Sequence, residues 1–255
     1  MIRTAGYALG LPLLLILIWW AATLGSTNFF VPKPGQLAST LVDVWVGERF
    51  FQDILPSVGR LLLGVALAIL LGVALGTAIG TVRWLRSLLE PLLEFFRAIP
   101  PPVLIPVLML LIGVNDQMKV GVIVMGCIWP VLLNTIEGVR AVDGTLSDTS
   151  RTFRISGASR LRYLVLPSAG PQIMAGVRQC LSIGLILMVI SEMFASSEGL
   201  GFTIVQFQRS FAIPEMWSGI VVLGLIGVAM SLVFQWSERR ILAWYHGQRE
   251  VEHAE

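Results

Sequence analysis

The sequence contains little charge, because only 13% of its 255 residues are Asp, Glu, Lys or Arg, whereas 55% are hydrophobic. An ordinary soluble domain carries about 25% charged residues, so the composition excludes a soluble globular protein. Disorder is also excluded, because it requires low hydrophobicity and high net charge, and the net charge here is +2. The basic residues form no continuous patch, which argues against a nucleic-acid partner. The remaining class is a membrane protein that crosses the bilayer several times.

Cysteine and histidine are equally scarce. Cys127 and Cys180 lie inside apolar runs without the close spacing of metal ligands, so both are expected to be packing residues. His246 and His253 lie in the polar C-terminal tail. We therefore expect no metal site.

Only two lysines are present, and neither suits a nucleotide-binding loop. A phosphate-binding Walker A loop requires Gly-Lys-Ser or Gly-Lys-Thr, whereas Lys33 is followed by Pro and Lys119 by Val. The sequence therefore predicts a non-catalytic chain that binds no cofactor of its own.

Long apolar runs predict an all-α protein with six transmembrane helices in one domain covering residues 1–255. About 20 apolar residues are needed to cross the hydrocarbon core as a helix. The first run follows Arg3 and resembles a signal peptide, but its interfacial pair Trp19 and Trp20 favours an uncleaved span. The expected spans are about 4–24, 61–82, 91–114, 118–138, 168–194 and 215–237.

The basic residues indicate how the chain is oriented, because positively charged loops stay in the cytoplasm. Eleven arginines fall on one side and five basic residues on the other, so both termini are expected to be cytoplasmic. The first set is Arg3, Arg83, Arg86, Arg140, Arg151, Arg154, Arg160, Arg162, Arg239, Arg240 and Arg249; the second is Lys33, Arg49, Arg60, Lys119 and Arg209.

Three connecting segments differ in character. The external segment 25–57 has apolar residues at helical spacing after Pro34, which predicts an amphipathic helix. The external segment 196–215 is expected to open with a flexible Gly199-Leu200-Gly201. Residues 140–166 form the long cytoplasmic segment, where a cytoplasmic partner would have to bind.

The cytoplasmic segment is too charged to cross the membrane. Candidate helix caps are Asp148, Thr149 and Ser150, and Gly157 permits a tight turn or a close backbone approach. The apolar face of the next helix is expected to consist of Leu161, Leu164 and Val165. From composition alone, an interfacial helix whose arginines only fix the topology is an equally good interpretation.

Motifs in this segment and along nearly the whole chain resemble one transporter family. In the family, this cytoplasmic motif has a glycine about midway and ends in Leu-Pro, and the motifs are specific when taken together. The matching residues are Ser156-Gly157-Ala158-Ser159-Arg160, Val165-Leu166-Pro167, Phe30-Val31-Pro32-Lys33-Pro34, Arg97-Ala98-Ile99-Pro100-Pro101-Pro102-Val103-Leu104-Ile105-Pro106, Pro130-Val131-Leu132-Leu133-Asn134-Thr135, Val139-Arg140-Ala141-Val142-Asp143, Glu198-Gly199-Leu200-Gly201 and Glu238-Arg239-Arg240. The chain resembles the permeases of binding-protein-dependent ATP-binding-cassette (ABC) importers, in the nitrate, sulfonate, taurine and bicarbonate branch.

The resemblance implies a type I importer permease fold in the bacterial inner membrane. It also implies a homodimer, an ATP-binding-cassette ATPase dimer that binds ATP and Mg, an external solute-binding protein and surrounding lipid as partners, with a small anion or small organic molecule as solute. The residues implied in ATPase coupling are Arg151, Arg154, Ser156, Gly157, Ala158, Ser159, Arg160 and Leu161. This sequence departs from the family where Arg151-Thr152-Phe153 replaces an acidic-Ala-Ala opening, and Gly157–Pro167 is about one helical turn shorter than usual.

The prolines at the start of the third span predict a break in the helix, because each proline removes a backbone donor. Such breaks normally face protein or a water-filled cavity, although a simple kink without solute contact is the alternative. The expected residues of the pathway or its gate are Arg97, Pro100, Pro101, Pro102, Pro106, Asn134 and Glu192.

Two ionisable residues lie within the fifth span, where charge is costly and usually faces the bundle interior. Arg178 and Glu192 are fourteen positions apart, or about 21 Å along a helix, so each needs another partner. Glu192 is interpreted equally well as a gate or as a packing residue.

Glycines recur at multiples of four along the second span, at Gly64, Gly72, Gly76 and Gly80. Small residues at this spacing allow helices to pack closely. We expect a packing role here rather than a gating role.

An ion-gradient-driven secondary transporter and a non-transporting membrane scaffold are the competing hypotheses. A secondary transporter would need ionisable residues near mid-membrane and usually an internal repeat, whereas only Arg178 is central and no repeat is visible. A scaffold leaves the proline break and the cytoplasmic motif without a purpose.

The bias of basic residues gives a testable topology. A cysteine introduced at Gln36 should react with a membrane-impermeant maleimide added from outside, and one at Ser159 should not, because positive loops remain in the cytoplasm. Labelling of position 159 from the external face would overturn the orientation.

Overall fold

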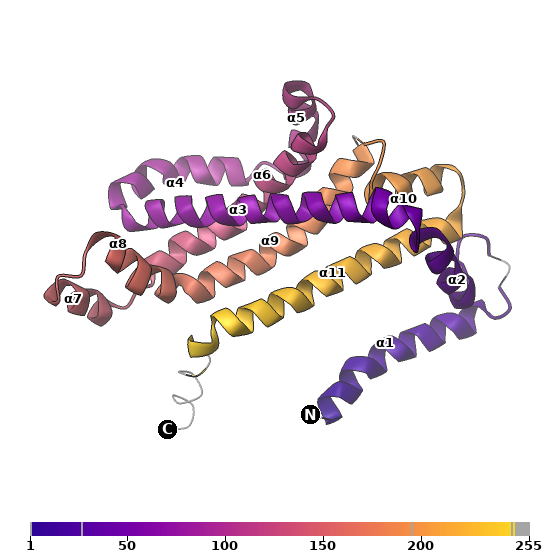
Figure 1. The fold of residues 1–255 in the computed structure, drawn as a ribbon, viewed down its shortest axis with the longest axis horizontal. Helices are drawn as coiled ribbons and strands as arrows, with labels where there is room; N and C mark the ends of the chain where they lie inside the picture. Colours follow the sequence, from indigo (N-terminus) through magenta and orange to yellow (C-terminus); the bar gives the residue numbers. More distant parts are fainter. Residues whose placement is uncertain (1, 27, 195, 246, 248–255) are drawn as a thin grey trace. The chain divides into compact units, whose positions relative to one another are not determined.

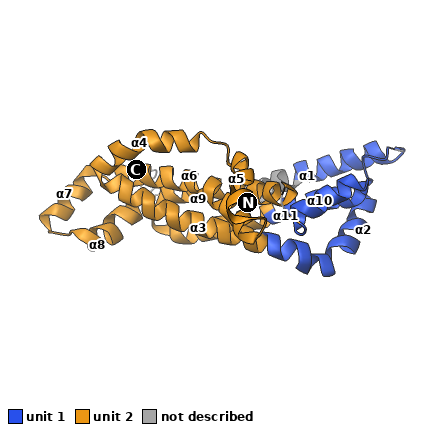
Figure 2. Ribbon diagram, turned by 90° about the horizontal axis from the view of Figure 1, so that it is seen from above, with its two compact units in different colours: residues 1–57, 197–226 blue, residues 58–196, 227–255 orange. Residues whose placement is uncertain are grey.

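The computed structural model describes residues 2–26, 28–194, 196–245 and 247, and all regular elements within them are helical (Figure 1). The all-α prediction is therefore confirmed. The chain divides into two compact units, shown in Figure 2. Unit 1 consists of residues 1–57 and 197–226, and unit 2 of residues 58–196 and 227–255.

Unit 1 contains the predicted amphipathic helix, which is α2 (Pro34–Trp45). The other elements of unit 1 are α1 (Ile2–Thr23), the π-helical turn η1 (Phe50–Ile54), α10 (Leu200–Arg209) and the first part of α11 (Ile213–Ile241). The apolar face of α2 buries Leu37 and Trp45, as the spacing after Pro34 predicts. The Trp45 indole Nε1 donates a hydrogen bond of 2.8 Å to Ser218 Oγ, which joins α2 to α11 within the unit.

The expected flexible opening at Gly199-Leu200-Gly201 is wrong, because this segment is the ordered start of α10. Gly199 has a φ of 105°, a region that favours glycine. Its N–H donates to Asp53 Oδ1 at 3.0 Å, and the N–H of Leu200 donates to Ser57 Oγ at 3.0 Å. Two donors that a helix start leaves unpaired are thereby satisfied.

Unit 2 holds most of the long helices. It contains most of α3 (Leu55–Thr81), then α4 (Arg83–Arg97), the 3₁₀ turn η2 (Pro101–Val103), α5 (Leu104–Ile112), α6 (Asp116–Arg140), α7 (Gly144–Thr152), α8 (Gly157–Arg160), the π-helical turn η3 (Leu161–Val165), α9 (Leu166–Phe194) and the second part of α11. Four of the described helices are long and apolar enough to cross a membrane, or five if α4 and the segment through α5 count as one bent span.

The third expected span, 91–114, is a bent pair and not a straight helix. The helices on either side of the proline run meet at an angle of 76°. The reason is chemical, since Pro100, Pro101 and Pro102 cannot donate backbone hydrogen bonds. With nine residues, α5 is only about 14 Å long, so it is long enough to cross a membrane only as part of the bent pair. The described residues thus account for four or five of the six expected spans.

Four glycines of α3 lie directly against α6. A Cβ atom at Gly64, Gly72, Gly76 or Gly80 would stand 2.6–2.9 Å from the nearest atom of Ile123, Val131, Thr135 or Val139, respectively. Each pair is separated by 59 positions, so the two helices run parallel in a constant register. The predicted packing role is confirmed.

Helix α9 packs on α6 through the same kind of contact. A Cβ at Gly176 would lie 2.7 Å from the Pro130 carbonyl oxygen, and one at Gly184 would lie 3.2 Å from Cys127 Sγ. Both cysteines are buried at this contact, and Cys127 Sγ donates to the Cys180 carbonyl at 3.3 Å. The expected packing role of the two thiols fits this placement, although the sequence gives no sign that they meet.

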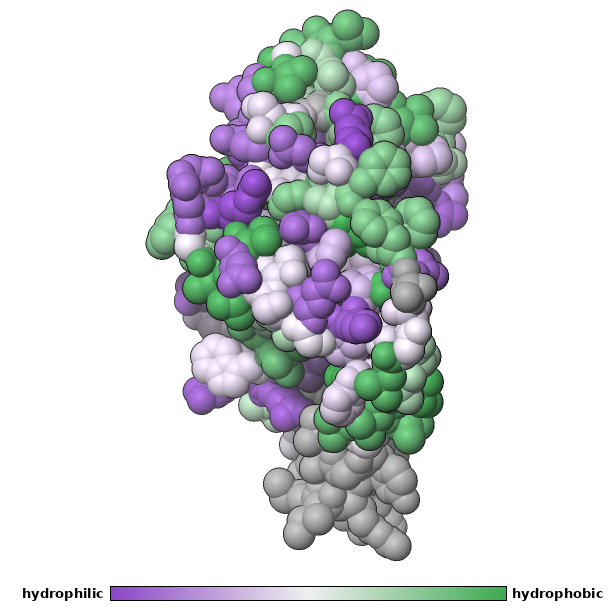
Figure 3. Space-filling model, turned by 90° about the vertical axis from the view of Figure 1, so that its right-hand side faces the viewer, coloured by the Kyte–Doolittle hydropathy of each residue, from purple (hydrophilic) through white to green (hydrophobic). Residues whose placement is uncertain are grey.

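Large apolar side chains remain on the outside of the molecule. Leu110 and Leu111 are 88% and 75% exposed, and the face in Figure 3 carries apolar residues in green beside polar residues in purple. Large apolar side chains exposed in such numbers are typical of contact with lipid or with partner chains.

The glycine register can be tested by adding a single methyl group. Gly76→Ala should destabilise the protein by about 1–3 kcal/mol, because overpacking a close contact has this cost, and the Leu132 carbonyl oxygen, 2.8 Å from the new Cβ, belongs to backbone that cannot turn aside. The measurement is thermal unfolding in detergent. The matched control is Gly59→Ala on the same helix, where a Cβ meets nothing within 4 Å. Equal stability of the two variants would contradict the contact.

Candidate functional site

The cytoplasmic segment begins with a capped helix. Asp143 is the N-cap of α7, and its Oδ1 accepts a 3.0 Å hydrogen bond from the N–H of Leu146. The expected caps Asp148, Thr149 and Ser150 are therefore wrong, because they lie inside α7. The observed cap, Asp143, stands five residues before the first of these expected caps.

A left-handed turn joins α7 to α8. Arg154 has a φ of 55°, and the Ile155 N–H donates to the Ser150 carbonyl at 2.8 Å, which closes the end of α7. Gly157 also has a positive φ, 57°, and a Cβ there would meet nothing within 4 Å. Gly157 therefore serves the turn, as expected, and is not needed for a close approach within this chain.

From Gly157 onward the chain is one helix through α8, η3 and α9, 38 residues long. Within it the Leu166 N–H donates to the Leu161 carbonyl, five residues back, so one turn is π-helical. Pro167 has no N–H to continue the ordinary pattern. The expected apolar face is present, because Val165 is buried against Val139 and Ala169, with Leu161 packed beside them.

The predicted coupling residues form an accessible surface. Arg151, Arg154, Ser156, Gly157, Ala158 and Ser159 are exposed, whereas Arg160 and Leu161 are half-buried. The Arg160 guanidinium donates to Ser147 Oγ at 2.9 Å, which ties α8 to α7. We call residues 144–165 the coupling surface.

The coupling surface also carries exposed apolar side chains that the sequence analysis missed. Phe153 is 74% exposed and Tyr163 is 71% exposed, and Leu146 and Ile155 accompany them. The available signal was an aromatic residue in each of two arginine-rich stretches.

The proline break belongs to unit 2, and its residues are partly buried there. Pro100 is extended and Pro101–Val103 form the 3₁₀ turn, while Pro101 packs on α6, 3.0 Å from where a Cβ of Gly126 would be. Pro100 and Pro106 are exposed and Pro102 is half-buried. The four prolines therefore do not share one environment.

A cavity of about 510 Å³ lies beside the break. Arg97 reaches it together with Glu94, and their side chains form an ion pair of 2.6 Å. Asn134 lies one turn beyond Pro130 on α6, and its Nδ2 donates to the Pro130 carbonyl at 2.8 Å. The cavity is lined by Glu94, Arg97, Ala98, Trp129, Pro130, Leu133, Gln179 and Ile183.

Glu192 lies away from this cavity. It is thirteen residues beyond Gln179 on α9, or about 20 Å along the helix. Its side chain is fully buried, and Oε1 pairs with Arg60 Nη1 at 2.9 Å. Arg60 also contacts Asp116 through Nε at 2.7 Å, and it is only 5% exposed. The sequence analysis counted Arg60 among the basic residues of an external loop, which is wrong, because Arg60 lies within helix α3.

Arg178 is too far from Glu192 to pair with it, and its partner is Glu238. Its Nη2 pairs with Glu238 Oε2 on α11, and its guanidinium lies 5.6 Å from the ring centre of Phe234. Among the described residues, no group of three His, Cys, Asp or Glu side chains is arranged to hold a metal. The two histidines, His246 and His253, lie outside the described residues.

Known proteins share both the sequence pattern and the fold. The taurine transport system permease protein TauC of Escherichia coli is 27% identical over 253 residues, covering 96% of this chain and 92% of its own length. The putative aliphatic sulfonates transport permease protein SsuC of Bacillus subtilis is 28% identical over 236 residues, covering 92% and 86%. A solved inward-facing structure of the MetNI methionine ABC transporter superposes with a TM-score of 0.64 at 15% identity, covering 74% of this chain and 94% of that one.

The family described as "Binding-protein-dependent transport system inner membrane component" matches residues 64–244. This range includes the glycine register, the proline break, the coupling surface and α9. The chain therefore belongs to this family, the permeases of binding-protein-dependent ABC importers.

Proposed function

We propose that this chain forms the solute pathway of an ABC importer and couples it to a separate ATPase dimer in the cytoplasm. Two copies of the chain would form the permease, and an external binding protein would deliver the solute. The complex would lie in the bacterial inner membrane with both termini cytoplasmic.

One observation carries the proposal: the exposed coupling surface is continuous with α9. Residues 157–194 form one helix, about 57 Å long. A helix that is closely packed against its neighbours moves as a rigid unit, because a close-packed interior transmits strain. Displacement of the coupling surface by an ATPase would therefore move the residues of α9 that line the cavity beside Arg97, including Gln179 and Ile183.

The energy source would belong to the partner. Because neither lysine stands in a Gly-Lys-Ser/Thr loop, ATP and Mg would be bound by the ATPase and not by this chain. The exposed aromatic residues of the coupling surface suit burial in a protein groove, since aromatic side chains are common anchors of interfaces.

The pathway would run beside the proline break. The backbone there is irregular, and irregular backbone at membrane depth is tolerated where it is buried in protein or lines a water-filled cavity. Glu94 and Arg97 present one charge of each sign to the cavity, which suits a small zwitterionic solute, or a small anion that replaces Glu94 at Arg97. The names of the relatives, taurine and aliphatic sulfonate permeases, agree with this class.

The coupling surface can be tested at Phe153. Phe153→Ala should weaken association with the ATPase roughly thirtyfold, because truncation of an interface anchor costs about 2 kcal/mol. The measurement is co-purification and titration of the two subunits in detergent. The matched control is Phe95→Ala on α4, where the phenyl ring is 64% exposed but lies outside the coupling surface. Unchanged association of the Phe153 variant would remove the docking role.

The division of labour can be tested by reconstitution. Solute accumulation in vesicles should require this chain, the ATPase, the binding protein and ATP together, because the chain has no phosphate-binding lysine. Each component is omitted in turn. Accumulation that persists without the ATPase and collapses when the ion gradient is dissipated would establish a secondary transporter instead.

A further inference from the structure

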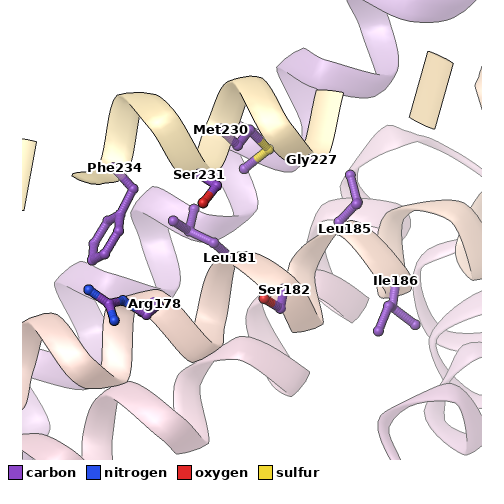
Figure 4. Close-up of a pocket in the computed structure, with 9 residues that line it drawn as sticks. All are labelled: Arg178, Leu181, Ser182, Leu185, Ile186, Gly227, Met230, Ser231 and Phe234. Carbon is purple, nitrogen blue, oxygen red and sulfur yellow. The ribbon is translucent and has the colours of Figure 1, made fainter. Parts of the chain in front are cut away.

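Arg178 stands at the junction of two cavities within unit 2, and its partner Glu238 lines the second of them. The first, of about 320 Å³, lies between α9 and α11 and is drawn in Figure 4. The second, of about 400 Å³, adjoins it, and both are lined by Arg178, Ser231 and Phe234. Pockets that hold small molecules usually have volumes of 300–1,000 Å³ and are mostly apolar with a few polar groups.

The two ends of the combined site differ in chemistry. Figure 4 shows Arg178 and Phe234 at one end of the first cavity and Leu185 and Ile186 at the other, with Ser182 and Ser231 between them. The second cavity adds Gln235, Glu238 and Arg239 beyond the arginine. The charged end therefore has two arginines and one carboxylate, and the opposite end is apolar.

The arginine has donors to spare for an incoming anion. Its guanidinium offers five N–H groups in a planar fork, and the ion pair with Glu238 is made through Nη2. The Arg178 side chain is 62% exposed, so it is accessible from the cavity. A charged residue in a membrane-spanning helix is costly, and it commonly marks a functional site.

We propose that this composite cavity binds a small organic anion with a short apolar tail. Arg178 and the hydroxyls of Ser182 and Ser231 would receive the anionic group, and Leu185, Ile186 and Met230 would surround the tail. Glu238 acts as the resident counter-ion that the ligand displaces. The view that the bound anion is the transported solute rests on the proposed function; the binding itself does not.

Direct binding tests the site without transport. The full chain is placed in phosphatidylcholine nanodiscs and titrated with butane-1-sulfonate by calorimetry. Inorganic sulfate lacks the tail and butan-1-ol lacks the charge, so both should bind at least about tenfold more weakly. Equal binding of sulfate and butane-1-sulfonate would overturn the role of the apolar end.

Two variants should shift the affinity in opposite directions. Arg178→Gln should weaken butane-1-sulfonate binding about tenfold or more, because charge-assisted hydrogen bonds to the anion are lost. Glu238→Gln should tighten it several-fold, because the competing carboxylate is neutralised. A merely structural ion pair would give no gain in Glu238→Gln, so unchanged or weaker binding by this variant overturns the proposal, as does unchanged binding by Arg178→Gln.

Two controls complete the design. Arg83→Gln removes an exposed arginine of α4, and binding should be unchanged; equal weakening by this variant would show a non-specific charge effect and overturn the site. Nanodiscs containing phosphatidylglycerol distinguish a lipid headgroup from a solute, since competition by this lipid of tenfold or more would assign the cavity to lipid. Binding without ATP-driven accumulation in reconstituted vesicles would contradict the proposed function alone.

Discussion

Close backbone contact between α3, α6 and α9 is the constraint on which the rest of unit 2 depends. A constant offset of 59 residues sets α3 against α6, and a glycine at 176 sets α9 against the Pro130 carbonyl. In a lipid bilayer, moving an apolar side chain from lipid into a helix interface gains little free energy, because both surroundings are apolar. Helix association therefore relies on close packing and on polar contacts. Because these glycines have no Cβ, the three helices pack tightly together. The cavity beside the proline break and the coupling surface both lie on this group of helices.

A buried ion pair also joins this group of helices. Arg60 and Glu192 form an ion pair at the same end of α3 and α9 where Asp116 begins α6. Removing one member of a buried pair leaves an unpaired charge, which costs far more than the pair contributes. The Arg60–Glu192 pair joins α3 to α9, and Glu192 lies about 20 Å along α9 from the part of that helix that lines the cavity at Arg97.

Periodicity and composition were sufficient for part of the structure and insufficient for the rest. The helical class, the α2 helix and the glycine contacts could be predicted, because each follows from a local repeat of 3.6 or four residues. The order at Gly199 and the buried position of Arg60 could not, because each depends on partners distant in sequence, such as Asp53 for Gly199. The proline run predicted the break in the third span but not its angle of 76°. The pairing of Arg178 with Glu238 was anticipated only as a need for some partner. Phe153 and Tyr163 were overlooked since exposure is a tertiary property.

The π-helical turn at Leu161–Val165 sets the rotational phase of the chain. Each residue of an α-helix turns the chain by about 100°, whereas a π-turn accommodates one extra residue within a single wider turn. Both π-turns are followed by the sequence Leu-Pro-Ser. It stands at Leu55-Pro56-Ser57 after η1 and at Leu166-Pro167-Ser168 after η3. Because the wider turn takes up one residue, loss of a single residue there can restore an ordinary α-helical turn and leave Gly157 and its neighbours on nearly the same face of the helix. Loss of a residue from a regular α-helical turn would instead rotate them by about 100°, so the π-turn is the place where the coupling segment can change its length by one residue.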